Sequence, residues 1–395
     1  MIKYQKNNDL TMQIAVSCIL FLATLNIFNK MAYLIFAAFL VLLLFKNFNT
    51  EINYMAILLI VFSLALILFS DISGILKNGI FTAIRNLIYP LIYIIGYNIY
   101  SKEDSDNKFQ NIMIFVGLGS FLHYILNMFI NTEAEGRNTK DIWSADVLSA
   151  TGQAALCCIA IGIFGALLYS KRKPIYKILA IAGLVSVLVY NLVLAGRTLI
   201  VLMLIVLIAG FLYYSILYKT KRFKTILPIC FVALFFVWAI RFNWFGIGDY
   251  VFDSNLFERF TEETTINSSS GRTDFKLEYL KYILIYPFGG GKIYNEVGRY
   301  AHDLLLDLYS DAGIIAAFII LVILLISLKN TFKVFKNKNI STDLKMLVFC
   351  VYIVIYIQFF LEPIMAGMPW LLALFLFYNG MISRRLEPTE KELQT

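Results

Sequence analysis

The stretch Thr198-Leu-Ile-Val-Leu-Met-Leu-Ile-Val-Leu-Ile-Ala-Gly-Phe-Leu-Tyr-Tyr-Ser-Ile-Leu-Tyr218 contains 21 consecutive residues without a charge. A helix needs about 20 apolar residues to cross the hydrocarbon core of a bilayer, so this stretch predicts a transmembrane helix. The chain as a whole has 60% hydrophobic and 15% charged residues and a mean hydropathy of +0.75. This composition lies outside the range of soluble globular domains. The sequence therefore predicts an all-α, polytopic integral membrane protein.

Apolar segments of this kind recur along almost the whole chain. They predict about 12 transmembrane helices, at 11–28, 31–45, 54–70, 79–99, 110–130, 148–170, 176–195, 198–218, 224–243, 312–328, 344–361 and 366–382. We interpret residues 1–395 as a single transmembrane domain, because no soluble domain or fixed-period repeat is visible. The first segment is expected to be a permanent anchor, since further spans follow it and no cleavage site is visible. The long polar interval 241–301 is expected to form a large loop that contains short helices.

Lysine and arginine residues predict the orientation of these spans. In membrane proteins, short cytoplasmic loops contain an excess of both residue types. If the spans are counted correctly, one side of the membrane contains Lys3, Lys6, Lys46, Lys171, Arg172, Lys173, Lys177, Lys219, Lys221, Arg222, Lys224, Lys329, Lys333, Lys336, Lys338, Lys345, Arg384 and Arg385. Both termini are then cytoplasmic and the loop 241–301 is external. The formal charge of +8 reflects this topology, and no nucleic-acid partner is needed to explain it.

The loop 241–301 has a pattern of its own. Residues 272–286 predict an amphipathic helix, with residues 269–271 as cap residues before it and Gly289-Gly-Gly291 as a turn after it. Helical spacing places Phe275, Tyr279, Leu280 and Ile283 on one side. We expect such a helix to lie in the plane of the membrane interface.

Several arginines are predicted to lie on the external side. Arg197 falls in the short turn Leu194-Ala-Gly-Arg-Thr198 between two spans. An arginine at mid-membrane costs about 2.5–3.5 kcal/mol, so this position indicates either an anionic partner or a side chain that extends to the lipid head groups. The same face is expected to hold Arg85, Arg241, Arg272 and Arg299. Guanidinium groups pair bidentately with phosphate oxygens, which makes a phosphate or diphosphate a suitable ligand for such a group of arginines.

The chain contains two histidines. His302 is expected to start the helix of the span at 312–328, and Asp303, Asp307 and Asp311 then share one helical stripe near the outer surface. A histidine there can take up a proton near neutral pH, although structural histidines and solvent-wetted acidic stripes are the more common arrangements. His123 lies in the middle of a span and is interpreted as a packing or hydrogen-bonding residue without a reactive partner.

Other sequence patterns restrict the chemistry. The sequence has no metal-ligand spacing, no suitable Ser/His/Asp order, no phosphate-binding glycine-rich loop and no nucleotide fingerprint. The five cysteines, Cys18, Cys157, Cys158, Cys230 and Cys350, fall within apolar spans, where they suit packing. We expect acid–base chemistry at the outer face, without a metal or a cofactor.

Three motifs resemble those of the O-antigen polymerase and O-antigen ligase superfamily. They are Gly196-Arg-Thr198 at a short external turn, Gly271-Arg272 with Tyr286-Pro-Phe-Gly-Gly-Gly291, and His302-Asp303 followed by Gly313-Ile-Ile-Ala316. The resemblance covers residues 194–316 together with the many-span architecture, and it rests on the order, spacing and sidedness of the motifs. Ligases generally have asparagine after the histidine, whereas this chain has Asp303. This difference favours a polymerase.

The resemblance implies a glycosyltransferase in the bacterial cytoplasmic (inner) membrane. Its donor and acceptor would be undecaprenyl-diphosphate-linked oligosaccharides, joined into O-antigen or capsular polysaccharide, with a possible chain-length regulator as protein partner. Arg197 and Arg272 would bind the diphosphate, His302 would activate the attacking hydroxyl, and Asp303 is a candidate to orient the imidazole. Arg299, Arg85 and Asp303 are further candidates for substrate binding. The alternatives are an O-antigen ligase that transfers finished glycan to a lipid core, and a flippase or transporter without enzyme activity.

Overall fold

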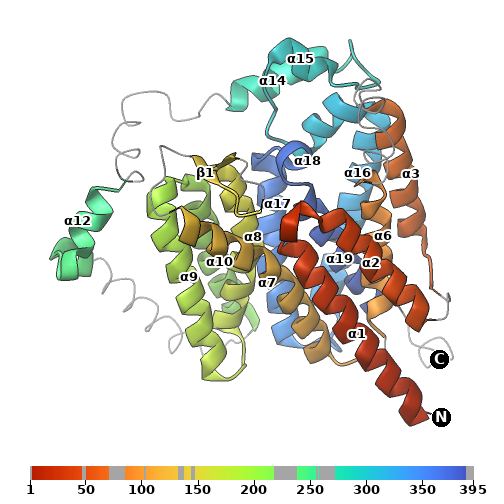
Figure 1. Cartoon of the computed structure of the whole chain (residues 1–395), viewed down its shortest axis with the longest axis horizontal. Helices are drawn as coiled ribbons and strands as arrows, with labels where there is room; N and C mark the ends of the chain where they lie inside the picture. The colour runs from red at the N-terminus through yellow and green to blue at the C-terminus, as the bar shows by residue number, and fades with distance from the viewer. Residues whose placement is uncertain are drawn as a thin grey trace. The chain divides into compact units, whose positions relative to one another are not determined.

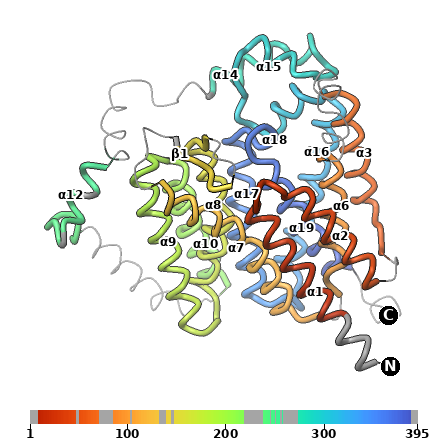
Figure 2. The backbone as a smooth tube through the Cα atoms, in the orientation of Figure 1, coloured from red at the N-terminus to blue at the C-terminus, as the bar shows by residue number. Residues whose placement is uncertain are grey.

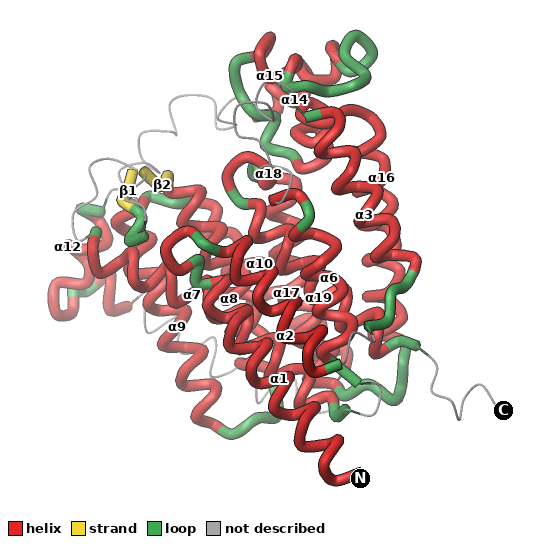
Figure 3. The backbone as a smooth tube through the Cα atoms, turned by 45° about the vertical axis from the view of Figure 1, so that its right-hand side comes forward, coloured by secondary structure: helices red, strands yellow, loops and turns green. Residues whose placement is uncertain are grey.

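The computed structural model describes residues 2–46, 50–70, 85–101, 104–131, 138–143, 147–217, 238–254, 257 and 272–387. These residues are mostly helical, as predicted (Figure 1). The strands among them are β1 (Asn138–Lys140) and β2 (Val147–Ser149), which form a short antiparallel hairpin (Figure 3). Lys140 lies opposite Val147 in this hairpin. The described part of the chain is therefore all-α in class.

The chain divides into two compact units. Unit 1 comprises Met1–Leu122, Gly271–Leu344 and Ile355–Thr395, and unit 2 comprises His123–Ser270 and Lys345–Val354. Two helices, α7 (Asp106–Ile130) and α17 (Thr342–Leu361), contribute residues to both units. The interpretation of the whole chain as one transmembrane domain stays a prediction.

Unit 1 is organised around the close packing of two helices, α6 and α19. Its helices are α1 (Ile2–Thr24), η1 (Ile27–Asn29), α2 (Met31–Phe45), α3 (Tyr54–Phe69), α6 (Ile88–Ile99), α14 (Arg272–Tyr282), α15 (Lys292–Val297), α16 (Leu304–Lys336), α18 (Ile364–Gly367) and α19 (Pro369–Arg385). A Cβ added to Gly96 of α6 would lie 2.2 Å from the carbonyl oxygen of Phe377, and one added to Gly380 of α19 would lie 2.3 Å from that of Tyr93. Glycine at both contacts lets the two backbones approach, which is a common way to pack helices in lipid.

Unit 2 packs α8 (Ala150–Tyr169) against α9 (Pro174–Leu194) and α10 (Arg197–Leu217). It also contains η2 (Trp244–Gly246) and α12 (Ile247–Phe252). Glycine again fits the contacts, because a Cβ on Gly165 would lie 2.1 Å from Cγ1 of Val206, and one on Gly183 would lie 2.4 Å from the ring of Phe164.

Ten apolar helices among the described residues overlap predicted spans, whereas α19 at the predicted span 366–382 is not one of them. Six are long and apolar enough to cross a membrane, namely Asp106–Ile130, Ala150–Tyr169, Pro174–Leu194, Arg197–Leu217, Leu304–Lys336 and Thr342–Leu361. Four are apolar but shorter, namely Asp9–Thr24, Met31–Phe45, Tyr54–Phe69 and Ile88–Ile99. Most of the predicted span 224–243 and the start of the span 79–99 lie outside the described residues. A membrane protein is thus supported by helix length and composition, while the count of 12 spans stays a prediction.

Unit 1 has two chemically different ends. Figure 2 shows α14, α15 and the start of α16 at one end and the first turns of α1 that are drawn in colour at the other. At the second end, Arg384 pairs with Glu51, and Arg385 pairs with Asp106 at 3.0 Å. The sequence predicts that Arg384 and Arg385 lie on the side of the membrane opposite His302, and this stays a prediction. Which side of a membrane each end faces stays a prediction.

Candidate functional site

His302 lies in a strained turn immediately before α16. Its φ is +57°, in the left-handed region that side chains other than glycine adopt at a cost of about 1–2 kcal/mol. The helix begins at Leu304, because the Asp303 carboxylate accepts hydrogen bonds from the backbone N–H groups of Leu305 and Leu306, at 3.1 and 3.4 Å. The sequence prediction placed the helix start at His302, so the capping residue moves it by two positions.

Asp307 holds this turn in place. Its carboxylate accepts hydrogen bonds from the N–H of Ala301, at 2.8 Å, and from the N–H of Asp303, at 3.2 Å, on either side of His302. Asp307 is only 1% exposed. The expectation of a solvent-wetted acidic stripe is therefore wrong for Asp307, because its two oxygens pair with backbone donors. An unfavourable conformation that neighbouring groups impose in this way often marks a functional residue.

Asp307→Asn is expected to destabilise the turn by about 1–3 kcal/mol, because the new NH2 group would face one of the two backbone N–H donors. We expect a lower unfolding temperature of the purified protein and a loss of activity. Asp311→Asn is the matched control, since Asp311 lies one helical turn further along the same stripe, whereas the hydrogen bonds to Ala301 and Asp303 come from Asp307. Equal unfolding temperatures for wild type and Asp307→Asn would contradict this role of Asp307.

Glu362 faces the imidazole of His302. It follows α17 directly and precedes Pro363, which disfavours continuation of the helix. Its Oε2 lies 3.6 Å from Nδ1 of His302, and its side chain is fully buried whereas that of His302 is 27% exposed. This distance is slightly longer than a hydrogen bond. The adjacent Asp303, expected to orient the imidazole, instead caps α16 and contacts Lys276.

Lys276 of α14 links the two segments that supply His302 and Glu362. Its ammonium group lies 3.2 Å from Oδ2 of Asp303 and donates a hydrogen bond of 2.7 Å to the carbonyl oxygen of Phe360. One side chain therefore fixes α14 to the start of α16 and to the end of α17. Sequence reasoning did not identify Lys276, because nothing in its neighbourhood along the chain distinguishes it from other surface lysines.

The segment 272–301 has a small apolar core. Tyr279, Ile293, Ala301 and Tyr309 are buried together, and the Tyr279 hydroxyl donates to the carbonyl oxygen of Arg299 at 2.8 Å. Burial raises the pKa of Tyr279 above its ordinary value, so the hydroxyl stays protonated at neutral pH. Helix α14 ends at Tyr282, four residues before the predicted end, since the next residues form a turn. The predicted cap residues 269–271 lie outside the described residues.

The turn Gly289-Gly-Gly291 packs directly against Gly313 of α16. Gly289, Gly290 and Gly291 have φ values of +74°, +75° and +70°, which confirms the predicted turn. Gly290 and Gly291 donate hydrogen bonds to the carbonyl oxygens of Asp311 and Ser310, both at 2.9 Å. Two residues after Asp311, α16 bends at Gly313, whose φ is +75° and ψ is −174°. A Cβ on Gly289 would lie 2.3 Å from the nitrogen of Gly313, so the turn and the bend require glycine at both positions.

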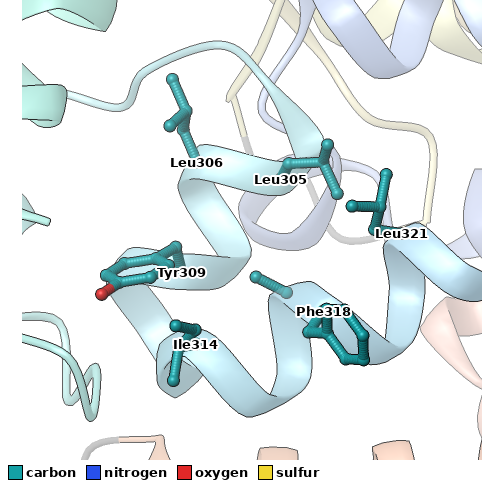
Figure 4. A pocket seen from close by; sticks show the side chains of 7 residues that line it. Leu305, Leu306, Tyr309, Ile314, Phe318 and Leu321 are labelled. Carbon is teal, nitrogen blue, oxygen red and sulfur yellow. The ribbon is translucent and has the colours of Figure 1, made fainter.

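The bend in α16 creates an apolar hollow on the surface of that helix. Its volume is about 230 Å³, and Figure 4 shows that side chains from both sides of the bend line it. Before the bend these are Leu305, Leu306 and Tyr309, and after it Ile314, Ala317, Phe318 and Leu321. Ile314 and Phe318 are exposed, so the apolar surface continues along α16. A lining of this kind suits a hydrocarbon chain.

The structure places several of the predicted arginines in unit 1. Arg299 is exposed, and its guanidinium lies 5.1 Å from the centre of the Phe275 ring. Arg272 is the first residue of α14, and its side chain is not among those described. Arg85 is exposed and lies just before the first residue of α6. The opposite end of α6 contains Asn98, whose side-chain amide forms hydrogen bonds with the backbone of Glu51.

Arg197 belongs to unit 2 and lies in a short turn, as predicted. Helix α9 ends at Leu194, Ala195 adopts a φ of +54°, and α10 begins at Arg197. Arg197 is half-buried at this first helical position. Arg241, which was expected on the same face, is exposed.

Unit 2 contains a buried polar pair that the sequence analysis missed. Nε2 of His123 lies 2.5 Å from Oδ1 of Asp141, with 3% and 5% of the two side chains exposed. The interpretation of His123 as a hydrogen-bonding residue is confirmed, and its partner is the carboxylate of Asp141. A signal was present, because His123 and Asn127 lie one helical turn apart on α7, and Asn131 follows at the same interval directly after the helix. Asn127 and Asn131 also bond to the segment around Asp141, at Ile142 and Lys140.

Comparison with known proteins identifies no relative of this chain, because no family model, no curated protein and no solved structure matches it.

Proposed function

We propose that this chain is a glycosyltransferase that polymerises lipid-linked oligosaccharide repeat units, as in the synthesis of O-antigen or capsular polysaccharide. The observation that supports this most strongly is the geometry of His302. Its imidazole is partly exposed, its backbone is held in a strained conformation by Asp307, and the buried carboxylate of Glu362 lies behind it. Such an arrangement suits a general base that takes up a proton and then needs its positive charge balanced.

In the proposed reaction, His302 accepts the proton of a sugar hydroxyl through Nε2. The hydroxyl oxygen attacks the anomeric carbon of the donor glycan, and the bond from that carbon to the diphosphate breaks. The bonding electrons leave with the polyprenyl diphosphate, and the configuration at the anomeric carbon is inverted by this single displacement. Glu362 stabilises the imidazolium through Nδ1. The reaction as written needs neither a metal nor a cofactor.

The arginines are proposed to bind the donor diphosphate. In the superfamily resemblance, Arg197 and Arg272 occupy the positions that bind this group. Arg299 and Arg85 are exposed in unit 1 and add positive charge that attracts an anionic donor. Guanidinium groups stabilise the charge that develops on a leaving diphosphate, which is where electrostatic stabilisation contributes most to catalysis.

The apolar hollow on α16 supports a lipid-linked substrate. Leu305 and Leu306, which line it, follow His302 by three and four residues. A substrate with a sugar and a diphosphate at His302 and a hydrocarbon chain in the hollow would match both surfaces. A water-soluble sugar donor would leave the hollow unused.

The finer topology belongs to the same proposal. We expect about 12 transmembrane helices in the bacterial inner membrane, with both termini cytoplasmic and His302 at the outer face. The acceptor is a second undecaprenyl-diphosphate-linked oligosaccharide, and a chain-length regulator is a possible protein partner. Asp303 in place of the ligase asparagine favours polymerisation over transfer to a lipid core.

A gel of surface glycan from cells that lack this protein tests the proposal against both alternatives. Loss of the long-chain ladder, with single repeat units still attached to their final acceptor, would support a polymerase. Complete loss of attachment with accumulated lipid-linked polymer would indicate a ligase. Single lipid-linked units that accumulate on the cytoplasmic face would indicate a flippase.

Arginine variants restore the ladder to different extents if the diphosphate is bound as proposed. Arg272→Gln is expected to reduce polymer synthesis by about 100-fold to 1,000-fold, as for other groups that stabilise a transition-state charge. Arg272→Lys keeps the charge but loses the bidentate geometry, so it should restore only part of the activity. At Arg197, too, the lysine variant is expected to keep more polymer synthesis than the glutamine variant. Full activity of Arg272→Gln at normal protein levels would exclude this role.

A further inference from the structure

The turn that follows α14 exposes large apolar side chains and has no part in the proposed reaction. We call residues 284–288 the apolar turn, and their sequence is Leu-Ile-Tyr-Pro-Phe. Leu284, Ile285 and Phe288 are 91%, 59% and 65% exposed. Contact of clustered apolar side chains with water is unfavourable, and such a cluster commonly marks an interaction surface. The apolar turn is therefore a candidate contact for an apolar partner.

Two contacts within unit 1 fix the position of the apolar turn. The carbonyl oxygen of Pro287 accepts a hydrogen bond of 2.9 Å from the N–H of Ile314, the first residue after the bend of α16. The ring of Phe288 stacks on the ring of Phe69, the last residue of α3, with 6.2 Å between the ring centres. The apolar turn therefore lies where the apolar helix α3 ends and where the apolar part of α16 begins.

The exposed apolar surface of these two helices continues onto the apolar turn. Helices α3 and α16 pack side by side (Figure 1). Next to the turn, Ile314 and Phe318 of α16 are exposed, and so is Leu68 of α3. Helix α16 is long and apolar enough to cross a membrane, so lipid would cover these side chains. A bilayer that covers them would also reach the turn.

The residues beside the apolar side chains suit the boundary between hydrocarbon and head groups. The rings of Tyr282 and Tyr286 stack, with 6.2 Å between their centres. The Tyr286 hydroxyl donates a hydrogen bond of 3.1 Å to Glu296, and the ammonium group of Lys292 lies 5.9 Å from the centre of the Tyr286 ring. Tyrosine is enriched at this boundary, and lysine places its charge in the head-group region while its stem contacts apolar surface.

We propose that the apolar turn inserts into the lipid bilayer and anchors the segment 272–301 at the membrane surface, with acyl chains against Leu284, Ile285 and Phe288. The sequence analysis expected Tyr279 of α14 on the lipid side, but the structure buries Tyr279 in the core of the segment, so the turn is the better contact. A second copy of the chain would cover the turn alone, whereas a bilayer covers the turn and the adjoining surface of α16. The proposal is independent of the glycosyltransferase proposal.

Photo-crosslinking of the full chain tests this proposal. The photoreactive residue p-benzoylphenylalanine replaces Leu284, and the purified protein is reconstituted into phosphatidylcholine vesicles and irradiated. We expect the mass of the protein to increase by one phosphatidylcholine, with the new bond on an acyl chain. The matched control places the same residue at Asn295, an exposed position of α15 in the same segment. The control should give about tenfold less lipid adduct, because a large apolar group partitions strongly into hydrocarbon.

Unfolding temperatures establish that both substituted proteins are folded. Equal yields of lipid adduct at Leu284 and Asn295 would overturn the proposal, because the apolar turn would then have no preferred contact with lipid. Adducts at Leu284 that involve only the choline head group would overturn insertion into the hydrocarbon. A crosslinked dimer in place of the lipid adduct at Leu284 would also overturn the proposal, and it would identify a second copy of the chain as the partner.

Discussion

Replacing His302 with asparagine is expected to reduce polymer synthesis by about 100-fold to 10,000-fold while the protein stays folded. The imidazole is the group that accepts the hydroxyl proton in the proposed reaction, and asparagine cannot replace it. Asparagine also tolerates the left-handed backbone conformation better than alanine does, so the φ of +57° at this position is preserved. The change therefore removes the base with little disturbance of the turn held by Asp307.

Two further variants separate chemistry from folding at His302. His302→Gly accepts the same backbone conformation without the Cβ cost of about 1–2 kcal/mol and should be as inactive as His302→Asn, whereas His302→Ala retains that cost. The glycan ladder and the unfolding temperature are measured for all three. Activity near the wild-type level in His302→Asn, at normal protein levels, would exclude the general-base role.

Gly313→Ala is expected to destabilise unit 1 by about 3 kcal/mol or more. Gly313 has a φ of +75° and a ψ of −174°, a region that is essentially restricted to glycine and costs other residues about 1–3 kcal/mol. A Cβ there would also lie 2.7 Å from the carbonyl oxygen of Pro287, and that oxygen accepts a hydrogen bond from Ile314. The bend of α16 and the turn that docks on it would therefore separate.

Gly289→Ala should have a comparable effect, because its Cβ would lie 2.3 Å from the nitrogen of Gly313. Gly290→Ala is the matched control. Gly290 has a φ of +75°, but a Cβ added there would meet no described heavy atom within 4 Å, so only the backbone cost of about 1 kcal/mol applies. Thermal unfolding in detergent measures all three variants. Equal losses at Gly289 and Gly290 would show that the close approach contributes nothing.

The membrane segments were predictable because lipid restricts what a spanning segment can be. A helix that satisfies its own backbone hydrogen bonds must be apolar over its whole length, so its bounds follow from composition. The apolar segment predicted at 31–45 is observed as the helix Met31–Phe45, and the segment at 148–170 as the helix Ala150–Tyr169. The turn at Gly289-Gly-Gly291 was predictable for a similar reason, since consecutive glycines favour positive φ.

The partners of His302 were not predictable from the sequence. Glu362 is distant from His302 in the chain, and only the packing of α17 against its neighbours brings its carboxylate to Nδ1. Asp303 was the obvious candidate because it is adjacent, but an aspartate directly before a helix is also a strong capping residue, and this role prevails. The bend at Gly313 was not predictable for another reason, since a single glycine within an apolar run does not by itself predict an interruption of the helix.

The most direct test of the account is chain extension by the purified protein. Lipid-linked single repeat units are extracted from cells that lack this protein and incubated with purified wild type or His302→Asn in detergent, and chain lengths are then measured. The account predicts a series of longer lipid-linked chains with wild type and single units alone with His302→Asn. No extension by folded wild-type protein, or equal extension by both proteins, would contradict it.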